Sequence, residues 1–93
     1  MKIKSFCHRG LEMFARLGDV SGIKSDHAPK LNQLLAQLAF SENMAVLRGI
    51  TGFHPVRKKF QSDIWSVKVS ASWRLMFRIE GGEVCDLDYA QYH

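Results

Sequence analysis

Residues 65–79 have the sequence WSVKVSASWRLMFRI, in which apolar and polar side chains alternate on both sides of a short polar break. A period of two is that of a β-strand that buries one face. The two runs, 65–70 and 73–79, therefore predict an antiparallel hairpin. The same period assigns Trp65 and Trp73 to the core and not to stacking on nucleic-acid bases.

A glycine pair after the hairpin, Gly81-Gly82, predicts a tight turn into a further strand over residues 84–89. Alternation puts apolar and acidic side chains on opposite sides of that strand: Cys85, Leu87 and Tyr89 on one, Asp86 and Asp88 on the other. The polar face of the hairpin carries Lys68, Arg74 and Arg78. The sheet is therefore expected to have one apolar and one charged face.

Helical periodicity governs the first half of the chain. Apolar residues recur at helical spacing over 11–17 and predict a helix that begins at Arg9 and ends at Gly18, a left-handed cap. The residues before it, 2–6, alternate charged and apolar side chains and predict a short strand.

A second helix is expected after a turn-like stretch. Ser25 or Asp26 is its predicted cap, and Pro29 lies in its first turn. Its core-facing stripe consists of Leu31, Leu34, Leu35 and Leu38. Residues 41–52 contain two glycines and predict a connection.

Helices come first and an antiparallel sheet follows, which is typical of the α+β class. The chain has 93 residues, 46% of them hydrophobic, and this suits one domain over residues 1–93. We therefore expect a compact domain with a sheet of about four strands and two N-terminal helices on one of its faces.

The net charge of +4 is modest, but its distribution is uneven. Residues 51–79 contain six Lys or Arg and one acid, whereas residues 80–93 contain four acids and no Lys or Arg. A basic middle with an acidic tail favours one face that meets a polyanion such as nucleic acid. A basic surface that is merely solvated is the alternative at this point.

Composition also bears on location and cofactors. No apolar run reaches the roughly 18–20 residues of a membrane span, and the first eight residues lack an apolar signal-peptide core. Cys7 and Cys85 have no zinc-site spacing and are expected to be buried thiols in a reducing compartment. The four histidines also lack ligand spacing. We expect a cytoplasmic protein with no membrane partner, no metal and no cofactor.

Residue types that suit RNA cleavage occur in the second half. Pro55 forces an extended backbone on His54, which precedes the cations Arg57, Lys58 and Lys59. Cleavage of RNA by its own 2′-hydroxyl needs a base, an acid and cationic groups for the charge that gathers on the phosphate. Histidine serves as acid or base near neutral pH, and arginine has a planar fork that matches phosphate oxygens. This route requires no metal.

Several blocks occur in a fixed order over nearly the whole chain. They are Ile3-Lys4-Ser5-Phe6 with Gly10-Leu11, Asp19-Val20-Ser21-Gly22-Ile23, Asp26-His27-Ala28, Phe53-His54-Pro55, Trp65-Ser66-Val67-Lys68-Val69-Ser70, Ser72-Trp73-Arg74-Leu75-Met76-Phe77-Arg78 and Asp88-Tyr89-Ala90-Gln91-Tyr92-His93. The ordered set resembles HigB toxins, the "proteic killer suppression" members of the RelE/ParE toxin superfamily. The resemblance implies a RelE-like fold and a ribonuclease that cuts translated messenger RNA in the ribosomal A site.

Carried over residue by residue, the catalytic site of this family falls on His54, Arg57, Arg74 and His93. The resemblance implies that His93 acts as general acid or base. It implies that Arg74 and Arg57 hold the scissile phosphate, and that His54 orients or shares the proton transfer. Further RNA contacts are expected from Lys58, Lys59, Lys68 and Tyr92.

The chain departs from the family pattern after Pro55. The family commonly has Leu-Lys-Gly-Asp there and a glycine before the Trp-Ser strand. This chain has no glycine in that loop, which looks about one residue longer, and Arg57 replaces the lysine. A guanidinium holds phosphate differently from an ammonium, so Lys58 fills the role instead if the loop register shifts.

The resemblance also implies partners. These are the ribosome, messenger RNA and a cognate HigA-type helix-turn-helix antitoxin, with operator DNA bound only through the toxin–antitoxin complex. Two other functions stay open. One is a DNA gyrase poison, as in the ParE branch, and the other is a catalytically silent module that binds RNA or the ribosome.

Overall fold

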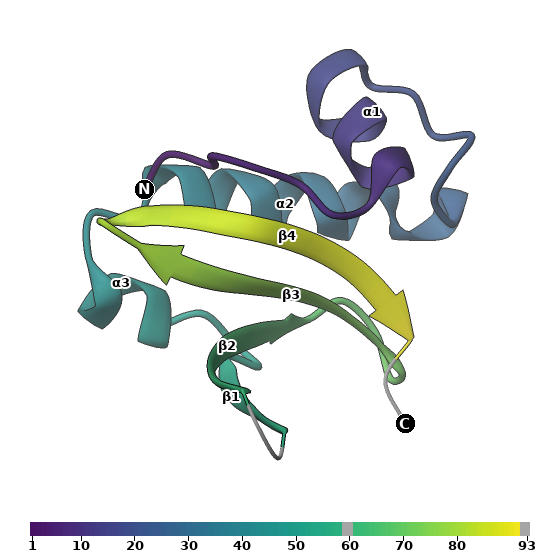
Figure 1. Ribbon diagram of the computed structural model, residues 1–93. Coiled ribbons are helices and arrows are strands. Elements are labelled where there is room, and N and C mark those ends of the chain that lie inside the picture. The colour runs from purple at the N-terminus through teal and green to yellow at the C-terminus, as the bar shows by residue number, and fades with distance from the viewer. Residues whose placement is uncertain (59–60, 92–93) are drawn as a thin grey trace.

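The computed structural model describes residues 1–58 and 61–91, in which helices cover one face of an antiparallel sheet (Figure 1). The helical elements are α1 (Arg9–Leu17), a 3-10 turn (Ser25–His27), α2 (Ala28–Phe40) and α3 (Met44–Arg48). The strands are β1 (His54–Lys58), β2 (Gln61–Lys68), β3 (Trp73–Glu80) and β4 (Glu83–Gln91), in that order across the sheet. The α+β class with two N-terminal helices on one face is confirmed. No helix in these described residues is long and apolar enough to cross a membrane.

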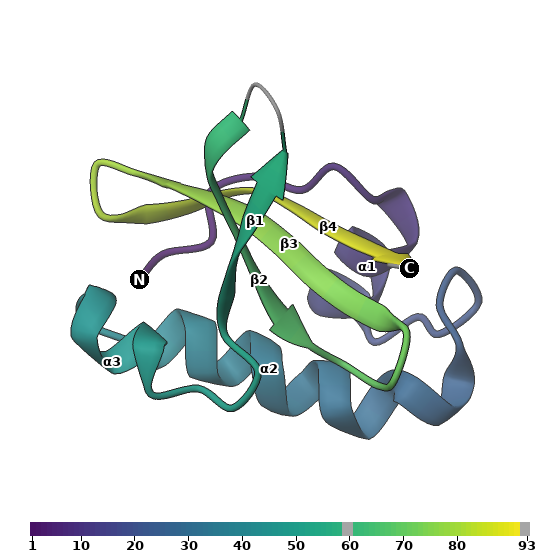
Figure 2. The same ribbon diagram turned by 90° about the horizontal axis from the view of Figure 1, so that it is seen from below.

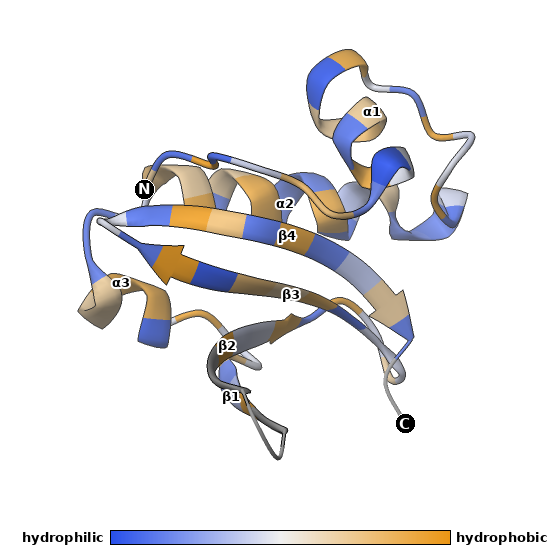
Figure 3. Cartoon of the chain, in the orientation of Figure 1, coloured by the Kyte–Doolittle hydropathy of each residue, from blue (hydrophilic) through white to orange (hydrophobic). Residues whose placement is uncertain are grey.

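The core lies between α2 and the apolar face of the sheet. All four leucines of the predicted α2 stripe are buried, and Leu75 and Phe77 of β3 meet them from the sheet. Figure 3 shows the alternation of apolar and polar residues along β3 and β4 that produces this face. Trp65 and Trp73 pack against the same cluster, as predicted. Each fully buried leucine contributes about 1.5–3 kcal/mol relative to an exposed one.

Both ends of α1 are capped. His8 Nδ1 accepts a hydrogen bond from the Leu11 amide at 3.0 Å, which satisfies one of the free N–H groups of the first turn. Gly18 has φ +72° and donates its amide to Phe14 O at 2.9 Å, so the predicted left-handed cap is confirmed. The start of the helix lies against the loop that follows it, because Gly10 touches the backbone of Gly22.

Replacing Gly10 with Ala is expected to destabilise the fold by about 2–3 kcal/mol, since overpacking costs roughly 1–3 kcal/mol and the neighbour here is backbone. A Cβ atom at Gly10 would lie 2.3 Å from Gly22 O. Gly18→Ala is the control, because a Cβ there meets nothing within 4 Å. It costs only the left-handed backbone, about 1 kcal/mol. Urea unfolding of both variants measures the difference, and equal losses would contradict a Gly10–Gly22 clash.

Two expectations for the helical half were wrong. Ser25 and Asp26 do not cap α2, because both belong to the 3-10 turn and His27 occupies the N-cap position without a side-chain bond. Pro29 does lie in the first turn. Within 41–52 the chain forms α3 and not a plain connection, because Asn43 Oδ1 accepts the Val46 amide at 3.1 Å and starts a helix of 5 residues.

The predicted strand over residues 2–6 is not a full strand. The segment runs parallel to β4 and pairs with it only at Ile3–Val84 and Phe6–Leu87. The Leu87 amide donates to Ser5 O at 3.0 Å. The N-terminal segment therefore covers one edge of the sheet, while the four true strands include β1, of which only the extended backbone at His54 was predicted.

A β-bulge in β4 corrects the predicted facing of Cys85. Asp86 has a left-handed backbone with φ +53°, and the pairing with β3 shifts by one residue there. As a result Cys85 pairs with Arg78 on the polar face, and Val84 takes its place in the core. Leu87 and Tyr89 face the core as predicted.

The two cysteines differ in environment. Cys85 is buried, as expected, but Cys7 is exposed, so the prediction of two buried thiols was wrong for Cys7. Desolvation by the neighbouring chain raises the pKa of the Cys7 thiol, and the charges of Asp86 and Asp88 raise it further. The Cys7 thiol is therefore protonated at neutral pH.

Candidate functional site

The charged side chains of the sheet gather on the face opposite α1 and α2, here called the outer face. Cross-strand partners point to the same side of a sheet, so the register defines rows on this face. The first row is His54, Ser66, Met76 and Asp88, and the second row is Lys68, Arg74 and Ala90. Figure 2 shows β1 and β2 standing steeply across β3 and β4, so the twist carries β1 out over this face.

Arg74 is the second residue of β3 and lies near one end of the outer face, in the second row between Lys68 and Ala90. Its side chain is half-buried, and the Nη1 atom of its guanidinium is fully buried. Partial burial lowers the local dielectric and strengthens the attraction of a cation for phosphate. The planar fork of a guanidinium can form two parallel hydrogen bonds to phosphate oxygens. The sequence prediction of Arg74 on the polar face is confirmed.

His54 reaches the same face from β1. Its side chain is exposed, and its carbonyl oxygen accepts a hydrogen bond from the buried Ser66 Oγ at 3.4 Å. On the opposite side of the strand, the ring of Phe53 stacks on Trp65 with ring centroids 5.2 Å apart. These two contacts anchor the backbone at His54 while its imidazole faces solvent.

Strand geometry gives the scale of the site. Two strand spacings of about 4.8 Å and one row of about 6.7 Å separate His54 from Arg74, which corresponds to about 12 Å between their Cα atoms in an untwisted sheet. Both side chains are long enough to reach a phosphodiester group between them. Lys68 is exposed beside Arg74, across one strand spacing. The outer face therefore combines one imidazole with two cations around an open surface.

The structure adds one residue that the sequence did not single out. Asp88 is half-exposed in the first row, diagonally next to Arg74 across β3 and β4. Its Oδ1 accepts a hydrogen bond from the Tyr89 amide at 2.9 Å. The alternation along 84–89 predicted that Asp88 lies on the outer face. The sequence offered no reason to choose Asp88 over Asp86 as a site residue.

Arg78 also faces outward, but its side chain stabilises the β-bulge at Asp86. Its Nη1 lies 3.2 Å from Asp86 Oδ2, and its other terminal nitrogen contacts Glu80. Ser5 Oγ in turn accepts the Asp86 amide at 2.8 Å. This network holds the left-handed backbone of Asp86 and ties the N-terminal segment to β4.

Several predicted site residues lie outside the described part of the structure. These are the side chains of Arg57 and Lys58 together with Lys59, Tyr92 and His93. The described backbone of β4 ends at Gln91, which pairs with Trp73, the residue next to Arg74. Of the eight predicted residues, the structure therefore brings together His54, Lys68 and Arg74.

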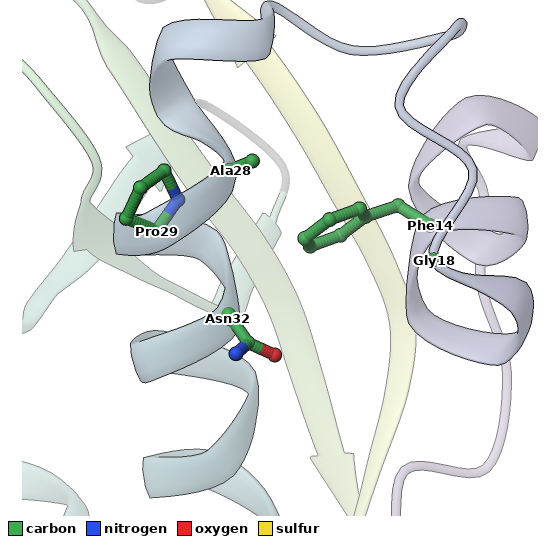
Figure 4. Close-up of a pocket in the computed structure, with 5 residues that line it drawn as sticks. All are labelled: Phe14, Gly18, Ala28, Pro29 and Asn32. Carbon is green, nitrogen blue, oxygen red and sulfur yellow. The ribbon is translucent and has the colours of Figure 1, made fainter.

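A pocket lies between α1 and α2, away from the outer face. Figure 4 shows the ring of Phe14 pointing from α1 towards Ala28, Pro29 and Asn32 at the start of α2. None of these lining residues titrates, so this pocket has no group for acid–base chemistry. Among the residues in 1–58 and 61–91, no three His, Cys, Asp or Glu side chains gather as metal ligands.

Similarities to known proteins extend over the whole chain. A profile of the family described as RelE-like toxin of type II toxin-antitoxin system HigB matches residues 4–93. The chain is 33% identical over 92 residues to a protein named Endoribonuclease HigB from Proteus vulgaris, covering 98% of this chain and 99% of that protein. The solved structure of a YoeB dimer from Staphylococcus aureus matches 100% of this chain and 99% of that chain with a TM-score of 0.64 and 14% identity. The likeness to YoeB concerns the fold.

Proposed function

The chain belongs to the HigB family of RelE-like toxins of type II toxin-antitoxin systems, and from this premise we propose that it is an endoribonuclease that cuts messenger RNA during translation. The observation that carries the proposal is the position of Arg74, half-buried on the outer face between Lys68 and Ala90, with His54 one row away. The relative named Endoribonuclease HigB supports the same activity.

The proposed reaction is attack of a 2′-hydroxyl on the adjacent phosphodiester. One histidine takes the proton of the 2′-hydroxyl, and another group gives a proton to the 5′-oxygen that leaves. His54 and His93 are the proposed proton-transfer groups. Arg74, helped by Arg57, is proposed to hold the phosphate and to stabilise the negative charge that develops on its oxygens. Each step uses a side chain of this chain.

Messenger RNA on the ribosome is the proposed substrate. His54 and Lys68 are exposed on an open sheet surface, so a free RNA strand would bind with little orientation. Orienting the 2′-hydroxyl in line with the phosphate contributes several orders of magnitude to such a reaction. We propose that the ribosomal A site supplies this orientation, and that Lys58, Lys59, Lys68 and Tyr92 contact the RNA.

The proposed partners follow from the family. A type II toxin has an antitoxin, here proposed to be a HigA-type helix-turn-helix protein through which the complex reaches operator DNA. The proposed location is the cytoplasm, where ribosomes translate messenger RNA. The open edge of β1 is a candidate antitoxin contact, because the N-terminal segment already covers the edge of β4.

Ribosome dependence is the first prediction of this proposal. Protein added to a reconstituted translation reaction is expected to produce new messenger RNA 5′ ends within the A-site codon, mapped by primer extension. The same RNA without ribosomes is expected to be cut at least about a hundredfold more slowly, because orientation is lost. Equal rates on free and translated RNA would contradict the role assigned to the ribosome.

The same reaction separates the two alternative functions. Intact messenger RNA together with cleaved DNA in a gyrase assay would indicate a gyrase poison. Intact messenger RNA with translation blocked, and with salt-sensitive binding to ribosomes that survives Arg74→Ala, would indicate silent ribosome binding. Either result would overturn the nuclease proposal.

A further inference from the structure

A buried pair of polar side chains lies beneath the outer face. His27 Nδ1 is 2.6 Å from Tyr89 Oη, and the two residues are only 7% and 4% exposed. The Lys24 amide donates a second hydrogen bond to Tyr89 Oη at 3.4 Å. The contact joins the start of α2 to β4 across 62 residues of sequence. The roles proposed above for site residues do not use either side chain.

The pair is part of an aromatic cluster that supports β3 and β4. The rings of Trp73 and Tyr89 stack with centroids 4.6 Å apart and planes at 27°. His27 meets the Trp73 ring edge-on at 5.6 Å, and His8 meets Tyr89 in the same way at 5.4 Å. Offset stacking and edge contacts are the favourable geometries for such rings, so the cluster is well packed.

Strand alternation connects this cluster to the site. Trp73 precedes Arg74 on β3, and Tyr89 stands between Asp88 and Ala90 on β4. Ala90 is the cross-strand partner of Arg74. Neighbours on a strand point to opposite faces, so the inner residues that are held by His27 flank the outer residues that form the site.

We propose that the His27–Tyr89 contact is a positioning contact for the nuclease site. It fixes the end of the sheet that carries Arg74 relative to α2, and thereby the position of the Arg74 guanidinium. The inference rests on the proposed function. A phenylalanine at position 89 would fill the same volume and stack on Trp73, but it would remove the hydrogen bond that joins β4 to His27 at the start of α2. A hydrogen bond is directional and fixes one arrangement.

The His27–Tyr89 contact also bears on the position of the end of β4. Gln91, the last described residue, pairs with Trp73 itself. Tyr92 and His93 follow it in the sequence, so a shift of β4 would move the starting point of both. Burial raises the pKa of the Tyr89 hydroxyl, which therefore stays protonated and available for this contact throughout the neutral range.

The test measures single-turnover cleavage of messenger RNA on programmed ribosomes at increasing protein concentration. Tyr89→Phe and His27→Gln are expected to lower the limiting rate roughly 10- to 100-fold, the cost of small misplacements. The half-saturating concentration is expected to stay within about twofold, because the exposed cations are unchanged. His27→Asn, which keeps a polar atom where Nδ1 stood, is expected to retain most of the rate. The double variant is expected to be no slower than either single variant, because the two substitutions remove the same His27–Tyr89 hydrogen bond.

Ser41→Ala is the matched control. Ser41 Oγ is part of a buried side chain and donates to Gln37 O at 2.6 Å at the far end of α2. Its loss is expected to lower the unfolding temperature as Tyr89→Phe does, with no change in cleavage rate. All variants are assayed at a temperature where thermal unfolding shows them folded. A Ser41→Ala variant as slow as Tyr89→Phe would overturn the inference, because the effect would then be one of general stability.

Wild-type protein and Arg74→Ala in the same assay distinguish failure of the nuclease function from failure of the positioning role. If wild-type protein makes no cuts, the proposed nuclease function fails and the positioning role fails with it. If wild-type protein cuts, Arg74→Ala does not, and Tyr89→Phe cuts at the wild-type rate, only the positioning role is overturned.

Discussion

Replacing Arg74 with Ala is expected to lower the limiting rate of messenger RNA cleavage by roughly 10²- to 10³-fold, the usual cost of removing one donor to a developing negative charge. The Arg74 guanidinium lies on the outer face with its Nη1 atom fully buried. Preorganised donors of this kind need no rearrangement as charge develops. The rate is measured in single turnover on programmed ribosomes.

Arginine-to-lysine changes provide the sharper comparison. Arg74→Lys keeps the charge but loses the two-pronged fork, and it is expected to lose most of the activity that Arg74→Ala loses. Arg78→Lys makes the same chemical change on the same strand and face, at a residue whose partners are Asp86 and Glu80. The Arg78→Lys variant is expected to cut messenger RNA at nearly the wild-type rate. Equal losses in the two lysine variants would contradict a specific role for Arg74.

Replacing His93 with Gln is expected to reduce cleavage by roughly 10²- to 10⁴-fold, the range for loss of general acid–base catalysis. His93 lies outside the described residues, so its role remains a prediction from the family resemblance. The pH dependence distinguishes its function. A general base gives a rate that rises with pH and then levels off, whereas a general acid gives a rate that falls as pH rises. The limb that disappears in His93→Gln, and not in His54→Gln, identifies the step that His93 serves.

Chemical rescue separates proton transfer from structural support at position 93. Added imidazole is expected to restore part of the rate of His93→Gly, because a free imidazole carries out the missing proton transfer. It is expected to have no effect on Arg74→Ala. A His93→Gln variant that cuts at the wild-type rate would remove His93 from the mechanism and leave His54 as the proposed histidine.

Periodicity explains which parts of the fold were predictable. The alternation over 65–79 and the leucine stripe of α2 each repeat several times, so β3, α2 and the second half of β2 were found. The predicted strand over 65–70 missed residues 61–64 of β2 and continued two residues past its end at Lys68. β1 has only 5 residues, and they include a proline and two cations, so no period is visible. α3 is equally short, and its only signal was the capping residue Asn43.

The remaining differences depend on contacts between distant residues. The run over 84–89 alternates whether or not a bulge is present, so the left-handed backbone at Asp86 was invisible in the sequence. The same is true of His27, which was only a residue next to a predicted cap until the fold brought it to Tyr89. In the site, the face of Arg74 followed from alternation. The relation of Arg74 to His54 required the register of three strands.

The N-terminal segment has a consequence for how the protein matures. Ser5 and Asp86 are joined by hydrogen bonds although 81 residues separate them, so this contact cannot form before β4 has been synthesised. During synthesis the N-terminal part of a chain emerges first, so residues 2–7 leave the ribosome before the strand they pair with exists. While β4 is still inside the exit tunnel, the sheet has an open edge and Arg74 lacks its neighbour. The outer face around Arg74 is therefore complete only after β4 has left the tunnel and paired with β3.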